Sequence, residues 1–221
     1  MGPPAPGVFV VSDRVAARLS TLETPVDAVA VLPLPERRAA AALAVPGGPA
    51  GGRDALVVCV DGLQDPGNVG TLIRAAAAFG ASAVVTSPGA ADPYGPKTVR
   101  AGMGALFALP VLAGVEVAEV VEGLPDAVVY GLDAHRGEPL DATALTRPAV
   151  LVVGAERAGL SAAAARRVDH LLTIPLAPAR PGAVESLNAG VAGAIALYEF
   201  ARRSSGAAED PSRRADAAQE G

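Results

Sequence analysis

The feature that most constrains the fold is a series of short apolar segments that alternate with helical patterns from residue 55 onwards. Five of these segments have strand length and are apolar almost throughout: ALVVCVDGL (55–63), SAVVTS (82–87), AVVYGLD (127–133), AVLVVGAE (149–156) and HLLTIPL (170–176). A strand that is apolar on both faces is typical of a parallel sheet covered on both sides. The sequence therefore predicts an α/β fold, with a parallel sheet flanked by helices.

Helical patterns lie between and after these segments. The first covers 69–79 and follows Pro66-Gly67-Asn68, which is typical of a turn. Shorter patterns cover 97–107, 116–123 and 161–167. A long pattern over 185–203 ends in two arginines, which suit the negative end of a helix dipole.

The chain divides unevenly. Residues 8–32 hold two β-like ends around a short helical pattern, and the stretch that follows is rich in proline, glycine and alanine. Such a composition suits a linker, and the polar residues near the C-terminus suit disorder. We expect an N-terminal part over 1–46, a linker over 47–54, the main domain over 55–203 and a disordered tail over 204–221.

Composition excludes several classes of protein. No apolar run is long enough for a membrane span, and the N-terminus lacks the basic and apolar regions of a secretory signal. The single cysteine, Cys59, excludes an internal disulfide and a cysteine-based metal cluster. A cytoplasmic protein without a metal site is the simplest interpretation. The formal net charge of −5 gives no global basic field, so nucleic-acid binding would need a local basic patch.

Polar residues and glycines follow four of the five apolar segments, at 64–68, 135–137, 157–159 and 185–188. In open parallel sheets, ligands bind outside the carboxyl ends of the strands, so this edge is the candidate site. The known nucleotide and hydrolase motifs are missing. No GxGxxG opens the first helix, GNVGT is not a Walker A loop, and no GxSxG elbow occurs.

Four ordered blocks carry a resemblance to a known family. They are NVGTLIRAAAAFGA (68–81), KTVRAGMGALFALPV (97–111), LVVGAERAGLS (151–161) and IP…GAVESLNAGVAGAIALYEFARR (174–203). In order and spacing they resemble the SpoU/TrmH family of RNA ribose 2′-O-methyltransferases, which belong to the SPOUT class. The resemblance covers roughly residues 55–203.

The resemblance implies a deep C-terminal trefoil knot, a feature that the apolar pattern does not show and that is rare among folds. It also implies a homodimer that binds S-adenosylmethionine in the knot and acts on ribosomal or transfer RNA. The dimer would bury the apolar face of the last helix, although a monomer could bury the same residues against its own sheet. That face comprises Val191, Ile195, Leu197 and Tyr198.

The resemblance also implies the site residues. The cofactor-binding set is Leu132, Gly154, Ile174, Pro175 and Leu187. The catalytic set is Arg74, Asn68, Glu156, Ser186 and Asn188. The RNA-binding set is Arg100, Arg157 and Lys97. From the residues alone, Ile174 and Leu187 are more typical of core packing and Ser186 of a helix cap, and Glu156 is nearly as consistent with a salt bridge. The two histidines, His135 and His170, are interpreted as structural.

Arg74 is the only charged residue of the helix expected over 69–79. Residues two apart in a helix lie about 200° apart, so Arg74 faces away from the core side of Leu72. In the family, the matching arginine lies at the reacting hydroxyl. Because a guanidinium stays protonated, we expect it to hold the RNA phosphate and orient the 2′-hydroxyl rather than remove its proton. A surface salt bridge is the alternative.

The chain departs from the family pattern at three places. Only residues 8–32 resemble the end of the L30e-like RNA-binding domain that usually precedes the knot, so 1–46 would be a remnant of it. The third motif is stretched by APARP (177–181), and Gly102 and Ala189-Gly190 replace hydroxyl-bearing positions. Two alternative functions therefore stay open: a knotted RNA- or cofactor-binding protein without activity, and an unrelated nucleotide-dependent reductase.

Overall fold

A computed structural model describes residues 7–20, 28–34, 52, 54–177 and 185–204. The chain forms two compact units, Met1–Glu36 and Arg37–Gly221. No helix in the described ranges has the length and apolar character needed to cross a membrane.

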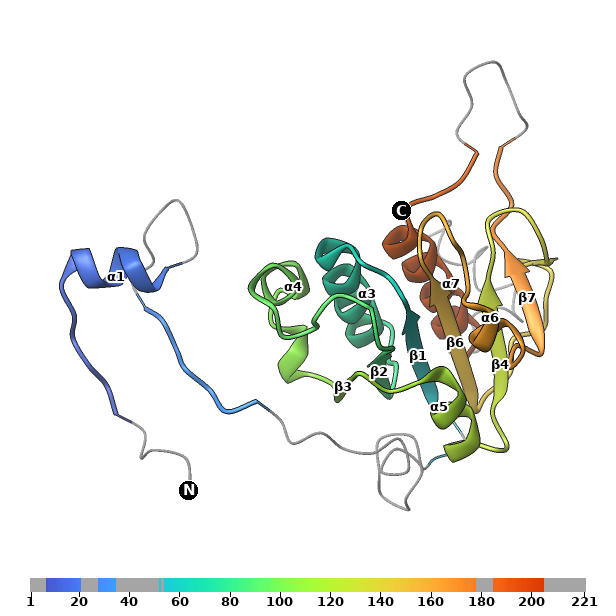
Figure 1. Cartoon of the computed structure of the whole chain (residues 1–221). Helices are drawn as coiled ribbons and strands as arrows, with labels where there is room; N and C mark the ends of the chain where they lie inside the picture. The colour runs from blue at the N-terminus through green and yellow to red at the C-terminus, as the bar shows by residue number, and fades with distance from the viewer. Residues whose placement is uncertain (1–6, 21–27, 35–51, 53, 178–184, 205–221) are drawn as a thin grey trace, which may run out of the picture. The chain divides into compact units, whose positions relative to one another are not determined.

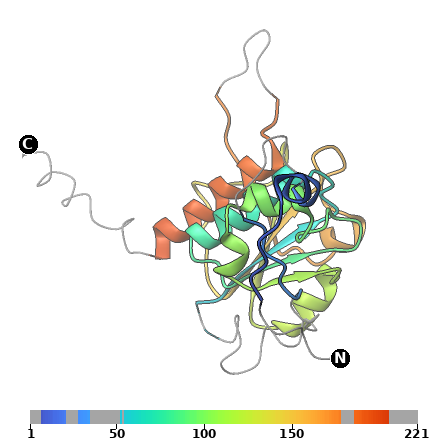
Figure 2. The same ribbon diagram turned by 90° about the vertical axis from the view of Figure 1, so that its left-hand side faces the viewer.

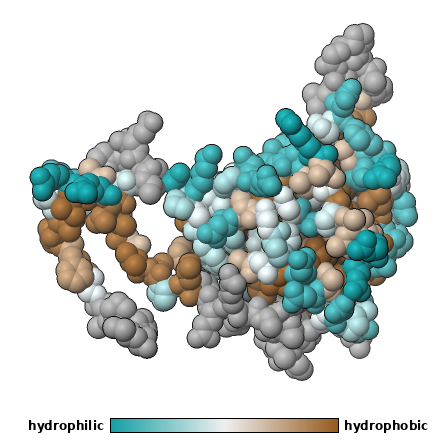
Figure 3. All heavy atoms as spheres, in the orientation of Figure 1, coloured by the Kyte–Doolittle hydropathy of each residue, from teal (hydrophilic) through white to brown (hydrophobic). Residues whose placement is uncertain are grey.

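In its described residues, the first unit contains one short helix, α1 (Asp13–Leu19). The β-like ends expected within 8–32 form no strand in the described part of this unit, because a strand needs a neighbour to satisfy its backbone groups. Several of its apolar side chains are exposed, among them Val8, Phe9 and Val31 (Figure 3).

The second unit is built on a parallel sheet with the strand order β3-β2-β1-β6-β4-β7-β5 (Figure 1). The strands are β1 (Leu56–Asp61), β2 (Ala83–Thr86), β3 (Val111–Ala113), β4 (Val128–Leu132), β5 (Glu138–Pro139), β6 (Ala149–Gly154) and β7 (His170–Thr173). The five long apolar segments are β1, β2, β4, β6 and β7, so that prediction is confirmed. The predicted strands omitted β3 and β5, which are edge strands of only three and two residues.

Helices cover both faces of this sheet, as predicted (Figures 1 and 2). They are α3 (Pro66–Ala78), α4 (Pro96–Gly102), the 3₁₀ helix η1 (Ala105–Phe107), α5 (Val117–Gly123), α6 (Ala162–Ala165) and α7 (Ala189–Ser204). One core lies under α3 and α7 and contains Leu56, Val58 and Val60 of β1. The other lies under α5 and α6 and contains Val57 and Cys59. This double burial explains why β1 lacks alternating polar residues.

The helix starts differ from the predicted ones. Pro66-Gly67-Asn68 is the first turn of α3 rather than a separate turn. Asp65 is its N-cap and accepts a hydrogen bond from the Asn68 amide at 2.9 Å, and proline is favoured at the first helical position. The last helix begins at Ala189, four residues later than predicted.

Glycines at the contacts allow two helices to pack closely against α3. A Cβ added to Gly70 would lie 2.6 Å from the carbonyl oxygen of Thr98 in α4, and one added to Gly193 of α7 would overlap the side chain of Leu72. The packing of α7 also divides the face that was expected at a dimer contact. Leu197 is fully buried in its own core, whereas Val191, Ile195 and Tyr198 are exposed.

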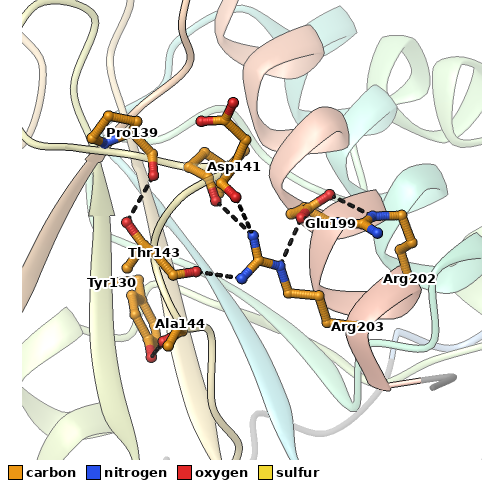
Figure 4. A network of polar contacts seen from close by, with 9 residues as sticks. Tyr130, Pro139, Asp141, Thr143, Ala144, Glu199, Arg202 and Arg203 are labelled. Atoms are coloured by element: carbon orange, nitrogen blue, oxygen red, sulfur yellow. Dashed lines mark hydrogen bonds and ion pairs between the residues drawn. The ribbon is translucent and has the colours of Figure 1, made fainter. Parts of the chain in front are cut away.

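The end of α7 carries a charged cluster (Figure 4). Glu199 accepts hydrogen bonds from Arg202 Nε at 2.9 Å, from Arg202 Nη2 at 2.6 Å and from Arg203 Nε at 2.7 Å. The hydrogen bonds from Arg202, with a smaller contribution from Arg203, lower the pKa of Glu199 from 4.5 to about 2, although burial opposes this shift.

We expect this cluster to make stability depend on pH in the acid range. Because the pKa of Glu199 is lower in the folded chain, its contribution is complete above pH 4.5 and is lost as the pH falls toward about 2. Urea unfolding at several pH values would measure the free energy of unfolding. Glu199→Gln should be less stable near neutral pH and lose less stability on acidification. Parallel pH profiles for the two chains would contradict this assignment.

Candidate active site

A cavity of about 290 Å³ opens at the carboxyl ends of β4, β6 and β7. Residues that follow these three strands form most of its wall, and Ala189 and Ala192 in the first turn of α7 complete it. This is the edge at which the sequence predicted a site, because parallel strands bring their carboxyl ends together.

The segment after β6 forms a tight turn at the cavity. Ala155 and Gly159 exchange two backbone hydrogen bonds of 3.0 and 2.9 Å, and Gly159 has a φ of +66°. A Cβ added to Gly154 would lie only 2.4 Å from the carbonyl carbon and oxygen of Gly159. Glycine at 154 therefore lets the turn fold back on the strand, and Glu156 and Arg157 lie within the turn.

The side chain of Glu156 is hydrogen-bonded to a residue that lies far from it in the sequence. Its Oε1 accepts a hydrogen bond from Asn68 Nδ2 at 2.5 Å, although the two residues are 88 apart in sequence. Asn188 lies close by, since a Cβ added to Gly190 would be 3.2 Å from Asn188 Oδ1 and 3.3 Å from Asn68 O. The lack of a side chain at 190 thus gives the two asparagines room to approach each other.

Asn188 also starts the last helix. Its Oδ1 accepts a hydrogen bond from the Val191 amide at 3.1 Å, so Asn188 fills the capping role that Ser186 was considered for. Ser186 instead lies before the helix and lines the cavity.

The segment after β4 adds charged groups that were not predicted at the site. Asp133 Oδ1 accepts hydrogen bonds from the amides of His135 and Arg136, and its Oδ2 pairs with Arg136 Nη2 at 2.9 Å. Burial alone would raise the pKa of Asp133, but these hydrogen bonds lower it below its ordinary value. All three residues line the cavity, including His135, which had been interpreted as structural. Their position directly after an apolar strand was the available signal.

A sequence profile described as the SpoU rRNA Methylase family matches residues 55–198. The chain belongs to this SpoU family.

Two similar proteins are named as methyltransferases of 23S rRNA. The SpoU chain is 35% identical over 193 residues to 23S rRNA (guanosine(2553)-2′-O)-methyltransferase RlmP of Bacillus subtilis, covering 87% of this chain and 71% of that protein. It is 37% identical over 158 residues to 23S rRNA (uridine(2479)-2′-O)-methyltransferase of Streptomyces viridochromogenes, covering 68% and 53%. The chain thus spans about half the length of the second relative.

Solved structures of the same family superpose on this chain. The SpoU methyltransferase AviRb of Streptomyces viridochromogenes, in complex with the cofactor AdoMet (S-adenosylmethionine), has a TM-score of 0.64 and 35% identity, covering 70% of this chain and 62% of that one. A structure described as an RNA 2′-O ribose methyltransferase has a TM-score of 0.66 and 30% identity, covering 87% and 70%.

Most of the residues that the SpoU resemblance implied meet at the cavity. Those that line it are Leu132, Gly154, Glu156, Arg157, Ile174, Ser186 and Leu187. Asn68 adjoins it through Glu156. Pro175 is exposed and does not line the cavity, although its neighbours Ile174 and Leu176 do.

The other basic residues that the resemblance implied, Arg74, Lys97 and Arg100, lie on α3 and α4. Arg74 is exposed on α3 while Leu72 and Ala76 are buried, which confirms the predicted orientation. Arg74 makes no ion pair with any described residue, so the alternative of a surface salt bridge is not observed. Lys97 and Arg100 are exposed on α4, the helix that packs against α3.

Proposed function

We propose that this SpoU chain transfers the methyl group of S-adenosylmethionine to a ribose 2′-hydroxyl of ribosomal RNA. The observation that carries the proposal is the convergence of the family's three motifs on one cavity. Gly154 and Glu156 come from the second motif, Leu187 from the third, and Asn68 of the first is hydrogen-bonded to Glu156. No observation favours a binding protein without activity.

The cavity has the chemical character that S-adenosylmethionine requires. Small-molecule pockets in proteins are usually about 300–1,000 Å³ and mainly apolar with a few polar groups, and the volume of this cavity lies close to the lower limit of that range. Leu132, Ile174 and Leu187 would hold the adenosine, and the backbone of the 155–159 turn would supply hydrogen bonds. When bound, the cofactor supplies an electrophilic methyl group on a sulfonium, so this chemistry needs no metal.

The protein must then position the hydroxyl, whose proton is released to water when the methyl group is transferred. Because Asn68 Nδ2 donates to Glu156, Asn68 Oδ1 is the atom left to accept a hydrogen bond from the 2′-hydroxyl. Glu156 therefore acts as a positioning residue for Asn68. Arg74 would hold the adjacent phosphate and orient the hydroxyl, and correct orientation of two reactants can lower a barrier by about 7–11 kcal/mol in the best cases.

Further phosphate contacts would set the register of the RNA. Arg157 lies at the cavity, and Lys97 and Arg100 are exposed on α4. Phosphate contacts position a nucleic acid but do not read its sequence. We propose that the segment over 1–46, part of which resembles the end of an L30e-like domain, assists this binding, and that the enzyme acts in the cytoplasm, where ribosomes are assembled in bacteria.

The knot and the dimer also belong to this proposal. In the sheet, β7 lies beyond β4, whereas α7 packs on α3 and β6, so the chain returns across the sheet after β7. The proposed trefoil knot forms where this return passes through the β4–β6 connection. The exposed Val191, Ile195 and Tyr198 of α7 support a homodimer contact. An experimental structure in which the chain after β7 does not pass through the β4–β6 connection would refute the knot. A monomer in sedimentation experiments would refute the homodimer.

Two linked measurements test the function. Calorimetric titration should show S-adenosylmethionine binding near one molecule per protomer and no binding of NADH. Incubation with labelled cofactor and either unmodified 23S rRNA or tRNA, followed by nucleoside analysis, should then give a 2′-O-methylated nucleoside from the ribosomal RNA. Cofactor binding without methyl transfer to any RNA would favour the inactive alternative, and methylation of tRNA alone would change the substrate.

A further inference from the structure

The last arginine of α7 makes contacts that its position at a helix end does not require. Arg203 Nη2 donates to the backbone carbonyl oxygens of Asp141 at 2.8 Å and Leu140 at 3.2 Å, and its Nη1 donates to that of Thr143 (Figure 4). Its Nε donates to Glu199. All three carbonyls belong to the connection between β5 and β6, so this arginine joins α7 to a segment about sixty residues earlier in the chain.

The connection is shaped to present these carbonyls. The amides of Ala142 and Thr143 both donate to Pro139 O at 3.0 Å, and Thr143 Oγ1 donates to the same oxygen at 2.8 Å. The resulting turn directs three other carbonyl oxygens toward one point, and the side chains of Leu140 and Thr143 are buried. A guanidinium has five donors in a planar fork and can serve several acceptors at once, which a lysine ammonium cannot do with the same geometry.

This turn is connected to the cavity wall through the sheet edge. The Leu140 amide donates to Thr173 O of β7 at 2.8 Å, and β5 pairs with β7 at Leu172 and Thr173. The chain directly before β5 also packs closely against β7, since a Cβ added to Gly137 would lie 2.3 Å from Leu171 O. The cavity-lining segment 133–136 directly precedes Gly137, and the lining residue Ile174 directly follows Thr173.

The other end of α7 lines the same cavity, with Ala189 and Ala192. Arg203 thus links α7 to a segment that is joined through β7 to other parts of the cavity wall. We propose that Arg203 is a positioning residue that holds the connection between β5 and β6 against β7 and thereby raises the affinity of the protein for S-adenosylmethionine. The affinity part of this proposal rests on the proposed function.

Arg202 offers a matched control on the neighbouring position. It donates to Glu199 through Nε and Nη2 and makes no hydrogen bond or ion pair with the described residues between β5 and β6, so Arg202→Gln removes a similar charge and a similar ion pair. Arg203→Gln removes the three carbonyl contacts as well. Arg203→Lys keeps the positive charge beside Glu199 and guards against a glutamine variant that fails to fold.

Two readouts test the proposal, both at a temperature well below the unfolding of every variant. In hydrogen–deuterium exchange without cofactor, the amides of Leu140, Ala142 and Thr143 should exchange faster in both Arg203 variants and not in Arg202→Gln. In calorimetric titration, the Arg203 variants should bind S-adenosylmethionine about fivefold or more weakly, the scale of typical coupling between distant sites. Arg202→Gln should stay within about twofold of the wild type.

Unchanged exchange in the Arg203 variants, or equal losses in Arg202→Gln, would overturn the proposal, because α7 would then be stabilised without positioning the connection. A wild-type chain that bound no S-adenosylmethionine would overturn the proposed function and the affinity part together. The exchange measurement would still decide whether Arg203 holds the connection.

Discussion

Replacing Arg74 with alanine should slow methyl transfer to RNA by about 10²- to 10³-fold, the usual cost of removing one charge-stabilising group from an active site. Affinity for S-adenosylmethionine should change only a few-fold. The reason is the position of Arg74 on the exposed side of α3, outside the cavity but on the helix whose first turn holds Asn68. Single-turnover methylation and calorimetric titration would measure the two quantities separately.

An arginine without a proposed role provides the control for this experiment. Arg166 is exposed at the end of α6, which packs on the opposite face of the sheet. Arg166→Ala should methylate RNA at the wild-type rate. Arg74→Lys should recover part of the activity if the charge holds a phosphate. If Arg74→Ala lost cofactor binding instead, Arg74 would belong to the cofactor site and the role assigned here would be wrong.

Gly154→Ala should largely abolish cofactor binding and also destabilise the fold. The new Cβ would lie 2.4 Å from backbone atoms of Gly159 and 2.6 Å from the Leu160 amide nitrogen, and backbone cannot yield as a side chain end can. Overpacking of this kind costs about 1–3 kcal/mol of stability. The larger effect should fall on the 155–159 turn, which must move away from β6. Thermal unfolding and calorimetric titration would measure both effects.

Gly102→Ala is the matched glycine control. Gly102 is buried in α4, but a Cβ there would meet only Gly70 O at 3.9 Å, an ordinary contact. This variant should fold and bind the cofactor like the wild type. If Gly154→Ala bound S-adenosylmethionine normally, the turn after β6 would not be a wall of the cofactor site.

The two predictions rely on features that differ in how far sequence could reveal them. The five long strands could be predicted because burial on both faces leaves continuous apolar runs. The edge strands β3 and β5 could not, since strands of two or three residues have no pattern of their own. The start of α3 was misplaced because Pro66 and Gly67 favour turns in general, whereas Asp65 makes them the first turn of a helix here.

The site residues likewise divide into those that the sequence could reveal and those that it could not. Gly154, Glu156 and Leu187 could be placed through the motifs that they belong to. The position of Asp133 and Arg136 at the cavity depends on which strands lie side by side, and the linear sequence does not show that order. Arg203 was interpreted from the helix dipole alone, because its three acceptors are backbone carbonyls, which every residue has. Contacts to backbone leave no mark in the residue types of the partner segment.

The strand order also determines which strand edges stay unpaired while the chain is being synthesised. The two central strands, β1 and β6, are paired along their whole length but are separated in the chain by β2, β3, β4 and β5. Until β6 leaves the exit tunnel, β1 has one unsatisfied edge, and β4 has no partner at all, because both of its neighbours are made after it. Before β6 is made, the nascent chain therefore presents apolar strands whose edge N–H and C=O groups are unpaired, and such edges favour aggregation.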